Sequence, residues 1–445
     1  PNSIQCAAAL ASIAIQSNQN DQHGGQSIPN FEYGLAPAVA RSFIKNVDLI
    51  LGILDAPEDF CAAVKDALHS RAFPDQKYDS FVSILNESGQ YFALSLLLKR
   101  FSEAESKRIL QKAIAKTDRD CYQAMEGLVH NLNTMHSRAG AQVPFSSINY
   151  GTDTTPEGRM VIKNILLAED AGLGNGETPI FPIHIFKVRE GYSYNPADPN
   201  YDLFKLACKV SAKRLFPNFS FMDAPFNKPY LQGNDPNHEV AYMGCRTRVM
   251  ANRYDPDRET TFGRGNLSFT SINLPRIGLR HRGDVDGFFA ELNEKLDLVF
   301  AQLLQRLEIQ SKKQCRNYPF LMGQGIWLDS DGLAPTDEVG DILKHGTLTT
   351  GFIGLAECLK ALIGVHHGES EKAQELGLSI VRTIRERADA KGAETKLNFT
   401  VIATPAEGLA GRFVKYDRKL FGVIPGITDR EYYTNSFHIP VYFPI

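Results

Sequence analysis

The sequence predicts an α/β fold in which helices cover a parallel sheet or barrel. The chain has 445 residues, of which 43% are hydrophobic and 22% charged, so it can form a sizeable packed core. From residue 142 to residue 405, segments with strand character alternate with segments of helical periodicity, which is typical of parallel α/β proteins. Since no change in composition marks a domain boundary, we expect one large domain over residues 1–445.

The first part of the chain is predicted to be mainly helical. Residues 4–16 are rich in alanine and apolar on nearly all sides, which indicates a buried helix. Residues 19–34 are polar and contain glycine, so we expect a loop there. Helical character returns over residues 35–117 and continues from Cys121 to His136.

Strands and helices are then expected to alternate. The predicted strands cover residues 142–151, 179–188, 218–225, 267–275 and 396–405. The predicted helices cover residues 157–170, 200–216, 285–309, 351–364 and 370–388. In such folds the loops at the carboxyl ends of strands carry the chemistry. We expect polar, glycine-bearing turns at those ends over residues 146–159, 172–179, 243–247, 263–266 and 404–412.

Charge and cysteine usage exclude several classes of protein. The formal net charge is −3, which argues against binding nucleic acid through a broad basic surface. The seven cysteines are scattered, odd in number and without CxxC spacing, which argues against a disulfide framework and against a metal site in this span. No apolar run reaches about 18 residues, so we expect no membrane span. These features predict a cytoplasmic protein with reduced thiols.

Two glycine-bearing turns suggest binding of phosphate groups. GLGNGE, residues 172–177, follows a helix and precedes a strand, the reverse of the order in dinucleotide-binding loops, so a helix C-cap explains it better. In residues 404–412, the N–H groups near Ala406 and Glu407 can hold phosphate at a helix start, with Thr404 and Arg412 beside them.

An ordinary helix cap also explains the second turn. Thr404 then caps the helix, Pro405 takes its first position and Glu407 completes a capping box. The two explanations are compatible, because a helix N-terminus is itself a site for anions.

Cys245 is the cysteine that the sequence singles out. Most free cysteines are small apolar residues of the core, and Cys6, Cys208 and Cys358 lie in apolar helical runs, as core thiols do. Cys245 instead lies in a predicted loop and is followed by the polar run 246–248. A thiol there suits a nucleophile or a carrier of hydrogen atoms in a radical reaction, and the spacing of residues leaves both open beside a packing role.

The motifs at these turns resemble those of anaerobic (class III) ribonucleoside-triphosphate reductases, a family of glycyl-radical enzymes. The resemblance extends along essentially the whole chain. The stretches that carry it are SNQNDQHGGQSIPNF, HNLNTMHSRAGAQVPFSSINYGTDTTPEGR, GNGETPIFPI, MGCRTRV, GRGNLSFTSINLPR, HGTLTTGFIGLAE, TPAEGLAGRF and YYTNSFHIPVYFP.

The resemblance implies a ten-stranded α/β barrel with a central finger loop, and reduction of ribonucleoside triphosphates to 2′-deoxyribonucleoside triphosphates. MGCRT matches the tip of the finger loop, so Cys245 is implied to form a thiyl that takes hydrogen from the ribose C3′. Asn266 matches the asparagine of the formate-using branch, which implies formate as the reductant. The family's loop for the substrate phosphates matches Thr404, Pro405, Ala406, Glu407 and Gly408.

The resemblance also implies groups that this chain lacks. The family's glycyl-radical loop and four-cysteine zinc module are expected beyond Ile445, and the allosteric modules, which bind dNTP and ATP effectors, before Pro1. We also place the second active-site cysteine before Pro1, because Cys6 aligns poorly with it. The implied partners are a radical S-adenosylmethionine activating enzyme with a 4Fe-4S cluster and a second copy of the protein, as a homodimer. We expect a fragment of a longer protein that does not turn over alone.

Two other functions remain open at the level of sequence. An acyltransferase or lyase of the glycyl-radical class shares the barrel, but it is expected to carry adjacent cysteines, whereas Met243 and Gly244 precede Cys245. A nucleotide-binding scaffold without catalysis would keep the phosphate loop and would not need the thiol.

Overall fold

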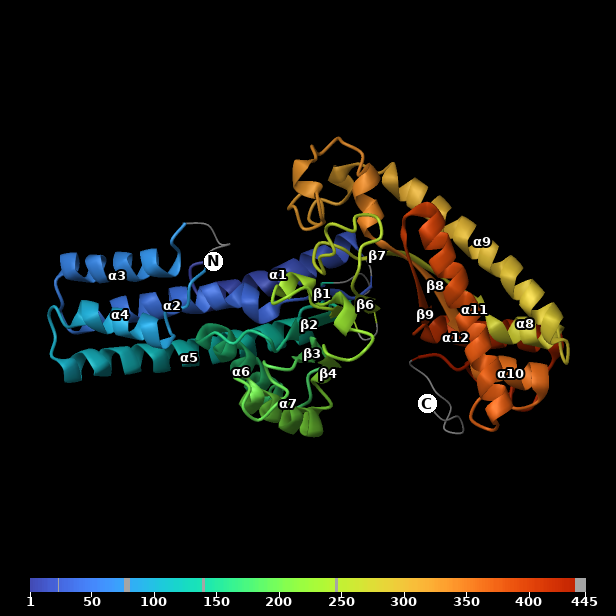
Figure 1. Ribbon diagram of the computed structural model, residues 1–445, viewed down its shortest axis with the longest axis horizontal. Coiled ribbons are helices and arrows are strands. Elements are labelled where there is room, and N and C mark those ends of the chain that lie inside the picture. Colours follow the sequence, from blue (N-terminus) through green and yellow to red (C-terminus); the bar gives the residue numbers. More distant parts are fainter. Residues whose placement is uncertain (23, 76–80, 138–140, 245–246, 437–445) are drawn as a thin grey trace. The chain divides into compact units, whose positions relative to one another are not determined.

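The computed structural model describes the chain except residues 23, 76–80, 138–140, 245–246 and 437–445 and the side chain of Glu407. The chain divides into two compact units (Figure 1). The first comprises Pro1–Met250 and Thr260–Phe262, and the second comprises Ala251–Glu259 and Gly263–Ile445.

The first unit begins with a bundle of helices. They are α1 (Ile4–Asp21), α2 (Phe31–Ile53), α3 (Glu58–Ala72), α4 (Glu87–Leu97) and α5 (Glu103–Thr134). Helix α2 packs against α5, and α4 lies beside α5 (Figure 1). Helix α5 starts with a capping box in which the side chains of Ser102 and Glu105 bond each other's backbone N–H. The predicted helical character of residues 35–117 and 121–136 is therefore confirmed.

Helix α1 is confirmed as a helix, but it is only partly buried. Leu10 and Ile13 are 51% and 50% exposed, and Cys6 is exposed beside them. The prediction of a helix buried on nearly all sides was wrong, because the face that carries Cys6, Leu10 and Ile13 is not covered by the rest of the described chain. The predicted loop 19–34 is also shorter than expected, because α1, α2 and the strand β1 (Gln26–Ile28) take part of it.

A parallel sheet follows in the first unit, with strand order β1-β2-β3-β4. Its further strands are β2 (Ser146–Tyr150), β3 (Ile183–Val188) and β4 (Asn218–Phe221). The helices between them are α6 (Pro156–Ala171) and α7 (Tyr201–Arg214), and 3-10 turns follow at Lys228–Tyr230 and Pro236–His238. Every residue of β2 and β3 is buried, as is typical of a parallel sheet that is covered on both faces. The alternation predicted from residue 142 is confirmed here.

The predicted loop around Cys245 is part of a hairpin. Strands β5 (Ala241–Met243) and β6 (Thr247–Val249) pair antiparallel, with Met243 opposite Thr247. Residues 245–246 lie outside the described residues. The structure therefore places the two arms of the hairpin, and the role expected of Cys245 stays a prediction.

The second unit contains a parallel sheet with the order β7-β8-β9. Its strands are β7 (Asn266–Asn273), β8 (Thr347–Ile353) and β9 (Asn398–Ala403). Its helices are α8 (Leu274–Arg280), α9 (Val285–Ser311), α10 (Leu355–Ile363), α11 (Glu371–Thr395) and α12 (Glu407–Phe421). Its 3-10 turns are Cys315–Asn317, Ser330–Gly332 and Gly340–His345. Strand β8 was not predicted from the sequence, and its last residues, 351–353, were expected to be helical.

The predicted α/β class is confirmed, and one expectation about cysteines is corrected. The described residues form two separate parallel sheets and one hairpin, so a closed ten-stranded barrel is not seen among them. Cys358 is buried as expected, but Cys6 and Cys208 are exposed, because α1 and α7 each keep an uncovered face. No helix in the described part of the chain is long and apolar enough to cross a membrane.

A buried carboxyl group lies in the core of the first unit. Glu169 of α6 is fully buried, and its Oε2 lies 3.5 Å from Nε2 of His184, whose Nδ1 is hydrogen-bonded to the Tyr150 hydroxyl at 2.9 Å. Burial raises the pKa of Glu169 to about 8, against a smaller opposing effect of Arg214, and burial lowers the pKa of His184 to about 3. Both side chains are therefore neutral in the folded protein near pH 7.

We predict that Glu169→Gln removes a pH-dependent loss of stability. In the unfolded chain this carboxyl ionises near its ordinary pKa of 4.5, whereas in the folded protein it holds its proton up to about pH 8. The stability it contributes is complete below pH 4.5 and is lost as pH rises through 8. In urea denaturation at pH 8.5, the variant is expected to exceed the wild type by about 1–3 kcal/mol in free energy of unfolding, with little difference at pH 5. Exposed Glu58→Gln is the control, and equal pH profiles for wild type and Glu169→Gln would refute the assignment.

Candidate functional site

A turn at the carboxyl end of β2 is held by a buried glutamate. Oε1 of Glu32 accepts hydrogen bonds from the backbone N–H groups of Gly151, Thr152 and Asp153, at 2.8, 3.0 and 3.2 Å. Burial raises the pKa of Glu32 to about 7, and the charge of Lys187 opposes this rise. The N–H groups of this turn are therefore hydrogen-bonded to the carboxyl group of Glu32. This turn is one of those that were expected from the sequence to carry chemistry.

An ion-pair cluster lies beside that turn. The Glu239 carboxylate binds Lys187 Nζ at 3.0 Å and Arg189 at 3.2 Å, and it accepts a hydrogen bond from the Thr152 hydroxyl at 2.9 Å. Lys187 is 1% exposed and also donates to Asn30 Oδ1 at 3.1 Å. This cluster was not predicted from the sequence, although the lysine inside the apolar strand IHIFKV indicates that a buried partner is needed.

The hairpin β5–β6 turns against the start of the first sheet. Gly244 has φ +63°, a conformation that glycine adopts readily, and its N–H donates to Ser147 Oγ at 3.0 Å. A Cβ on Gly25 would come within 3.1 Å of the Gly244 Cα, so the chain before β1 and the hairpin are in close contact. The neighbour of Cys245 is thus fixed on buried polar side chains of the first unit.

The predicted phosphate loop lies at the carboxyl end of β9 and leads into α12. Ala406 occupies the N-cap of α12, and its methyl side chain cannot cap the helix. The predicted Thr404 cap was wrong, because the Thr404 hydroxyl is hydrogen-bonded to Ser271 Oγ at 2.7 Å instead. Pro405 and Gly408 are exposed. In the described part of the chain, no N-cap side chain bonds the N–H groups of the first turn of α12, which is the arrangement that a phosphate site requires.

Asn266 does not lie near this loop. It is the first residue of β7 and pairs with Thr347 of β8. Thr347 in turn pairs with the first residue of β9. Thr404 follows the last residue of β9 and bonds Ser271, five positions along β7 from Asn266, which corresponds to about 17 Å of strand. The prediction that the 263–266 turn lies at the carboxyl end of a strand was therefore wrong, since it precedes β7.

The other predicted turn, residues 172–179, also precedes a strand. Gly172 is the C-cap of α6, with φ +81°, and Leu173 forms a bridge with Glu177 before β3 begins. The explanation by a helix C-cap is confirmed, and the placement of this turn at a carboxyl end was wrong.

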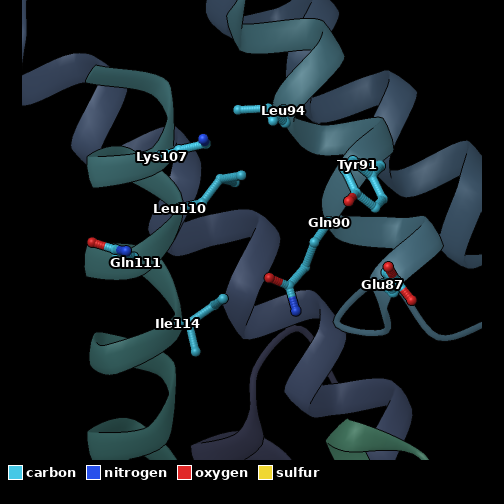
Figure 2. Close-up of a pocket in the computed structure, with 8 residues that line it drawn as sticks. All are labelled: Glu87, Gln90, Tyr91, Leu94, Lys107, Leu110, Gln111 and Ile114. Atoms are coloured by element: carbon cyan, nitrogen blue, oxygen red, sulfur yellow. The ribbon is translucent and has the colours of Figure 1, made fainter. Parts of the chain in front are cut away.

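Three cavities in the described part of the chain lie within single units. One of about 500 Å³ lies between α5, α6 and α7 in the first unit. One of about 330 Å³ is bounded in the second unit by Ser271, Asn273 and Arg276 on one side and by Lys295 and Gln302 of α9 on the other. Another, of about 380 Å³, lies between α4 and α5 in the first unit (Figure 2). Its lining residues are Glu87, Gln90, Tyr91, Leu94, Lys107, Leu110, Gln111 and Ile114. None of the predicted site residues lines this cavity. In the described part of the chain, no group of three His, Cys, Asp or Glu residues could hold a metal ion.

Comparison with known proteins identifies close relatives. A family model described as anaerobic ribonucleoside-triphosphate reductase matches residues 1–445. The protein of that name from Escherichia coli (strain K12) is 34% identical over 342 residues, which cover 74% of this chain and 45% of that protein. The one from Enterobacteria phage T4 is 33% identical over 353 residues, which cover 77% of this chain and 55% of that protein. The chain thus spans about half the length of the curated relatives it matches.

Solved structures support the same fold. The anaerobic ribonucleotide reductase from Thermotoga maritima with dATP bound in the specificity site has a TM-score of 0.58 and 16% identity, over 99% of this chain and 62% of that chain. The same enzyme in complex with dATP and CTP has a TM-score of 0.56 and 16% identity, over 98% of this chain and 60% of that chain. At this identity the likeness concerns the fold. The resemblance inferred from the motifs is confirmed by the family match.

We predict that Gly351→Ala disturbs the phosphate loop. Gly351 lies on β8 between β7 and β9, and an added Cβ would overlap both Ser271 Oγ and Thr404 Oγ1. The hydrogen bond between these hydroxyls must then break or the strands must shift, at a cost of about 1–3 kcal/mol in free energy of unfolding by urea denaturation. Gly332→Ala in the same unit is the control, because its added Cβ meets open space. Equal stability of the two variants would show that the contact is not needed.

Proposed function

The chain belongs to the anaerobic ribonucleoside-triphosphate reductase family, and we propose that the full-length protein reduces ribonucleoside triphosphates to 2′-deoxyribonucleoside triphosphates. The observation that carries the proposal is the family match over residues 1–445, in which a thiol, Cys245, follows the hairpin strand β5 and an uncapped helix start follows β9. The match favours this activity over an acyltransferase and over a scaffold without catalysis.

In this proposal the triphosphate binds at the start of α12. Within the segment Thr404–Gly408, the backbone N–H groups of Glu407 and Gly408 donate to phosphate oxygens, because Pro405 has no N–H and the N–H groups of Thr404 and Ala406 are bonded to the Phe352 and Thr404 carbonyls. The positive end of the helix dipole adds to the attraction. The bond between Ser271 and Thr404 holds the segment against the sheet. The related Thermotoga maritima enzyme with dATP and CTP bound supports nucleotides as ligands, and we extend this to ribonucleotide substrates and to dNTP and ATP effectors here.

The sulfur of Cys245 would carry the hydrogen transfer. As a thiyl it takes the hydrogen atom from the ribose C3′, the 2′-hydroxyl leaves as water after protonation, and the same hydrogen later returns to C3′. Two electrons are needed, and formate supplies them on oxidation to carbon dioxide, so that one triphosphate, one formate and one proton give one deoxynucleotide, one carbon dioxide and one water. We assign Asn266 to this reductant, because its carboxamide can donate to a small carboxylate.

The remaining parts of the enzyme would lie outside this chain. We propose that flanking segments supply the glycyl radical that oxidises Cys245, a zinc site, the second active-site cysteine and the effector modules. A radical S-adenosylmethionine partner with a 4Fe-4S cluster would generate the glycyl radical. We further propose that residues 1–445 form one catalytic domain, a ten-stranded barrel closed around a finger loop at β5–β6, in a cytoplasmic homodimer. A closed barrel would keep the radicals away from water.

We predict that Cys245→Ala abolishes reduction in the full-length, anaerobically activated protein. One sulfur atom contributes little to binding, so the dissociation constant for the triphosphate should change by less than about threefold, while product formation disappears. The measurements are deoxynucleotide formation by chromatography and nucleotide binding by calorimetry. Cys208→Ala, at an exposed thiol of α7, is the control. Activity that survives Cys245→Ala would overturn the proposed function.

We predict that Asn266→Ala separates substrate binding from reduction. The variant should bind the triphosphate normally, because Asn266 lies at the other end of the sheet from the phosphate loop. Release of carbon dioxide from labelled formate should fall by about 100-fold or more, in parallel with deoxynucleotide formation. Asn195→Ala, in a loop of the first unit, is the control. Unchanged formate consumption would remove Asn266 from the site and leave the role of Cys245 standing.

A further inference from the structure

One side chain hydrogen-bonds both backbone groups of a residue in the hairpin arm that leads to Cys245. The carboxamide of Asn149 accepts from the Tyr242 N–H at 2.8 Å and donates to the Tyr242 carbonyl at 2.9 Å. Asn149 is 0% exposed, and its Nδ2 also lies 3.0 Å from Ser27 Oγ and 3.3 Å from the Ile28 carbonyl. The carboxamide thus takes the place that a peptide group of a neighbouring strand would take.

Two serines extend this attachment on either side. Ser27 Oγ of β1 donates to the same Tyr242 carbonyl at 2.7 Å, and Ser147 Oγ of β2 accepts from the Gly244 N–H at 3.0 Å. Ser147 and Asn149 are two positions apart on a strand, so their side chains leave the same face of the sheet. We call Ser27, Ser147 and Asn149 the hairpin clamp.

The clamp forms hydrogen bonds with backbone N–H and carbonyl groups of the hairpin that are not used in the pairing of β5 with β6. Strand β5 pairs with β6 along one edge, and the backbone groups of Tyr242 point to the sheet instead. A buried N–H or carbonyl without a partner is costly, so the three side chains fix both the register and the distance of β5 from the sheet. Polar residues in strands that are otherwise fully buried are expensive to keep without such partners.

We propose that the hairpin clamp, with Asn149 at its centre, is a set of positioning residues that holds β5 and Gly244 in the register that hydrogen transfer by Cys245 requires. This rests on the proposed function, in which Cys245 is the reacting thiol. Cys245 is three residues beyond Tyr242 and directly follows Gly244, so a shift of β5 moves its main chain. A misplacement of about 1 Å between reacting groups can lower a rate about 100-fold, which makes the attachment of the hairpin a direct determinant of turnover.

The test uses Asn149→Asp in the full-length, anaerobically activated protein. Aspartate has the same shape and still accepts from the Tyr242 N–H, but it cannot donate to the Tyr242 carbonyl, Ser27 or Ile28. We expect kcat to fall at least about tenfold, with KM for the triphosphate within about twofold of the wild type. The glycyl radical signal in electron paramagnetic resonance should keep its wild-type intensity, since the clamp lies in the first unit and not on the radical loop.

A second measurement reports on the hairpin itself. Alkylation of Cys245 by iodoacetamide, followed by peptide mass spectrometry on the inactive protein, should be at least about threefold faster in Asn149→Asp and in Ser147→Ala, because a loosened hairpin exposes its thiol more often. Ser146→Ala is the matched control. Ser146 neighbours Ser147 on β2, is equally buried, and its hydroxyl has no hydrogen-bond partner among the described residues.

The outcomes separate the clamp from the proposed function. If Asn149→Asp fails to fold, Ser27→Ala and Ser147→Ala decide, since each removes a single hydroxyl. Wild-type kcat and alkylation rates in the folded clamp variants would overturn the clamp while Cys245 remains essential. A fall in kcat that Ser146→Ala reproduces, or that comes with an equal rise in KM, would also overturn it, because it would reflect general loss of structure. Activity in Cys245→Ala would remove the proposed function instead.

Discussion

The hydrogen bonds between the Asn149 carboxamide and the backbone of Tyr242 are the constraint on which this account depends. A short antiparallel hairpin is only marginally stable alone, so its place must be set by whatever it packs against. Here that support is a parallel sheet whose central strands are wholly buried. A polar residue inside such a strand needs a partner, and the hairpin supplies it.

The two units carry different parts of the proposed chemistry. The first carries the hairpin and a set of buried charges, in which Glu239 forms ion pairs with both Lys187 and Arg189 near the carboxyl ends of β2 and β3. The second carries the uncapped start of α12, braced by Ser271 and Thr404, and Asn266 at the far end of the same sheet. In the proposed function, the thiol, the phosphate groups and the reductant are each held by different local contacts. A substitution at one of these contacts can therefore change one group and leave the other two in place.

The sequence predicted most elements and misplaced several of the groups that matter. Long periodic segments such as α9 and apolar runs such as β3 were predicted because their patterns are strong. Strand β8 was missed because its threonines and Gly351 do not alternate, and Gly351 is needed only because two hydroxyls from neighbouring strands meet there. The prediction that Thr404 caps α12 was wrong, because the Thr404 hydroxyl is hydrogen-bonded to Ser271, a residue far away in the sequence. Glu32 and Asn149 bond backbone groups far away in the chain, which no local pattern reveals. Motifs located Cys245, Asn266 and residues 404–408, whose roles remain proposals.

The central claim is that the sulfur of Cys245, next to a hairpin arm that Asn149 holds, carries out the hydrogen transfer. The most direct measurement is an anaerobic crystal structure of the full-length protein with a bound ribonucleoside triphosphate. We expect the ribose C3′ within about 3–4 Å of the Cys245 sulfur. A Cys245 sulfur packed among helices and out of reach of the ribose would contradict the account.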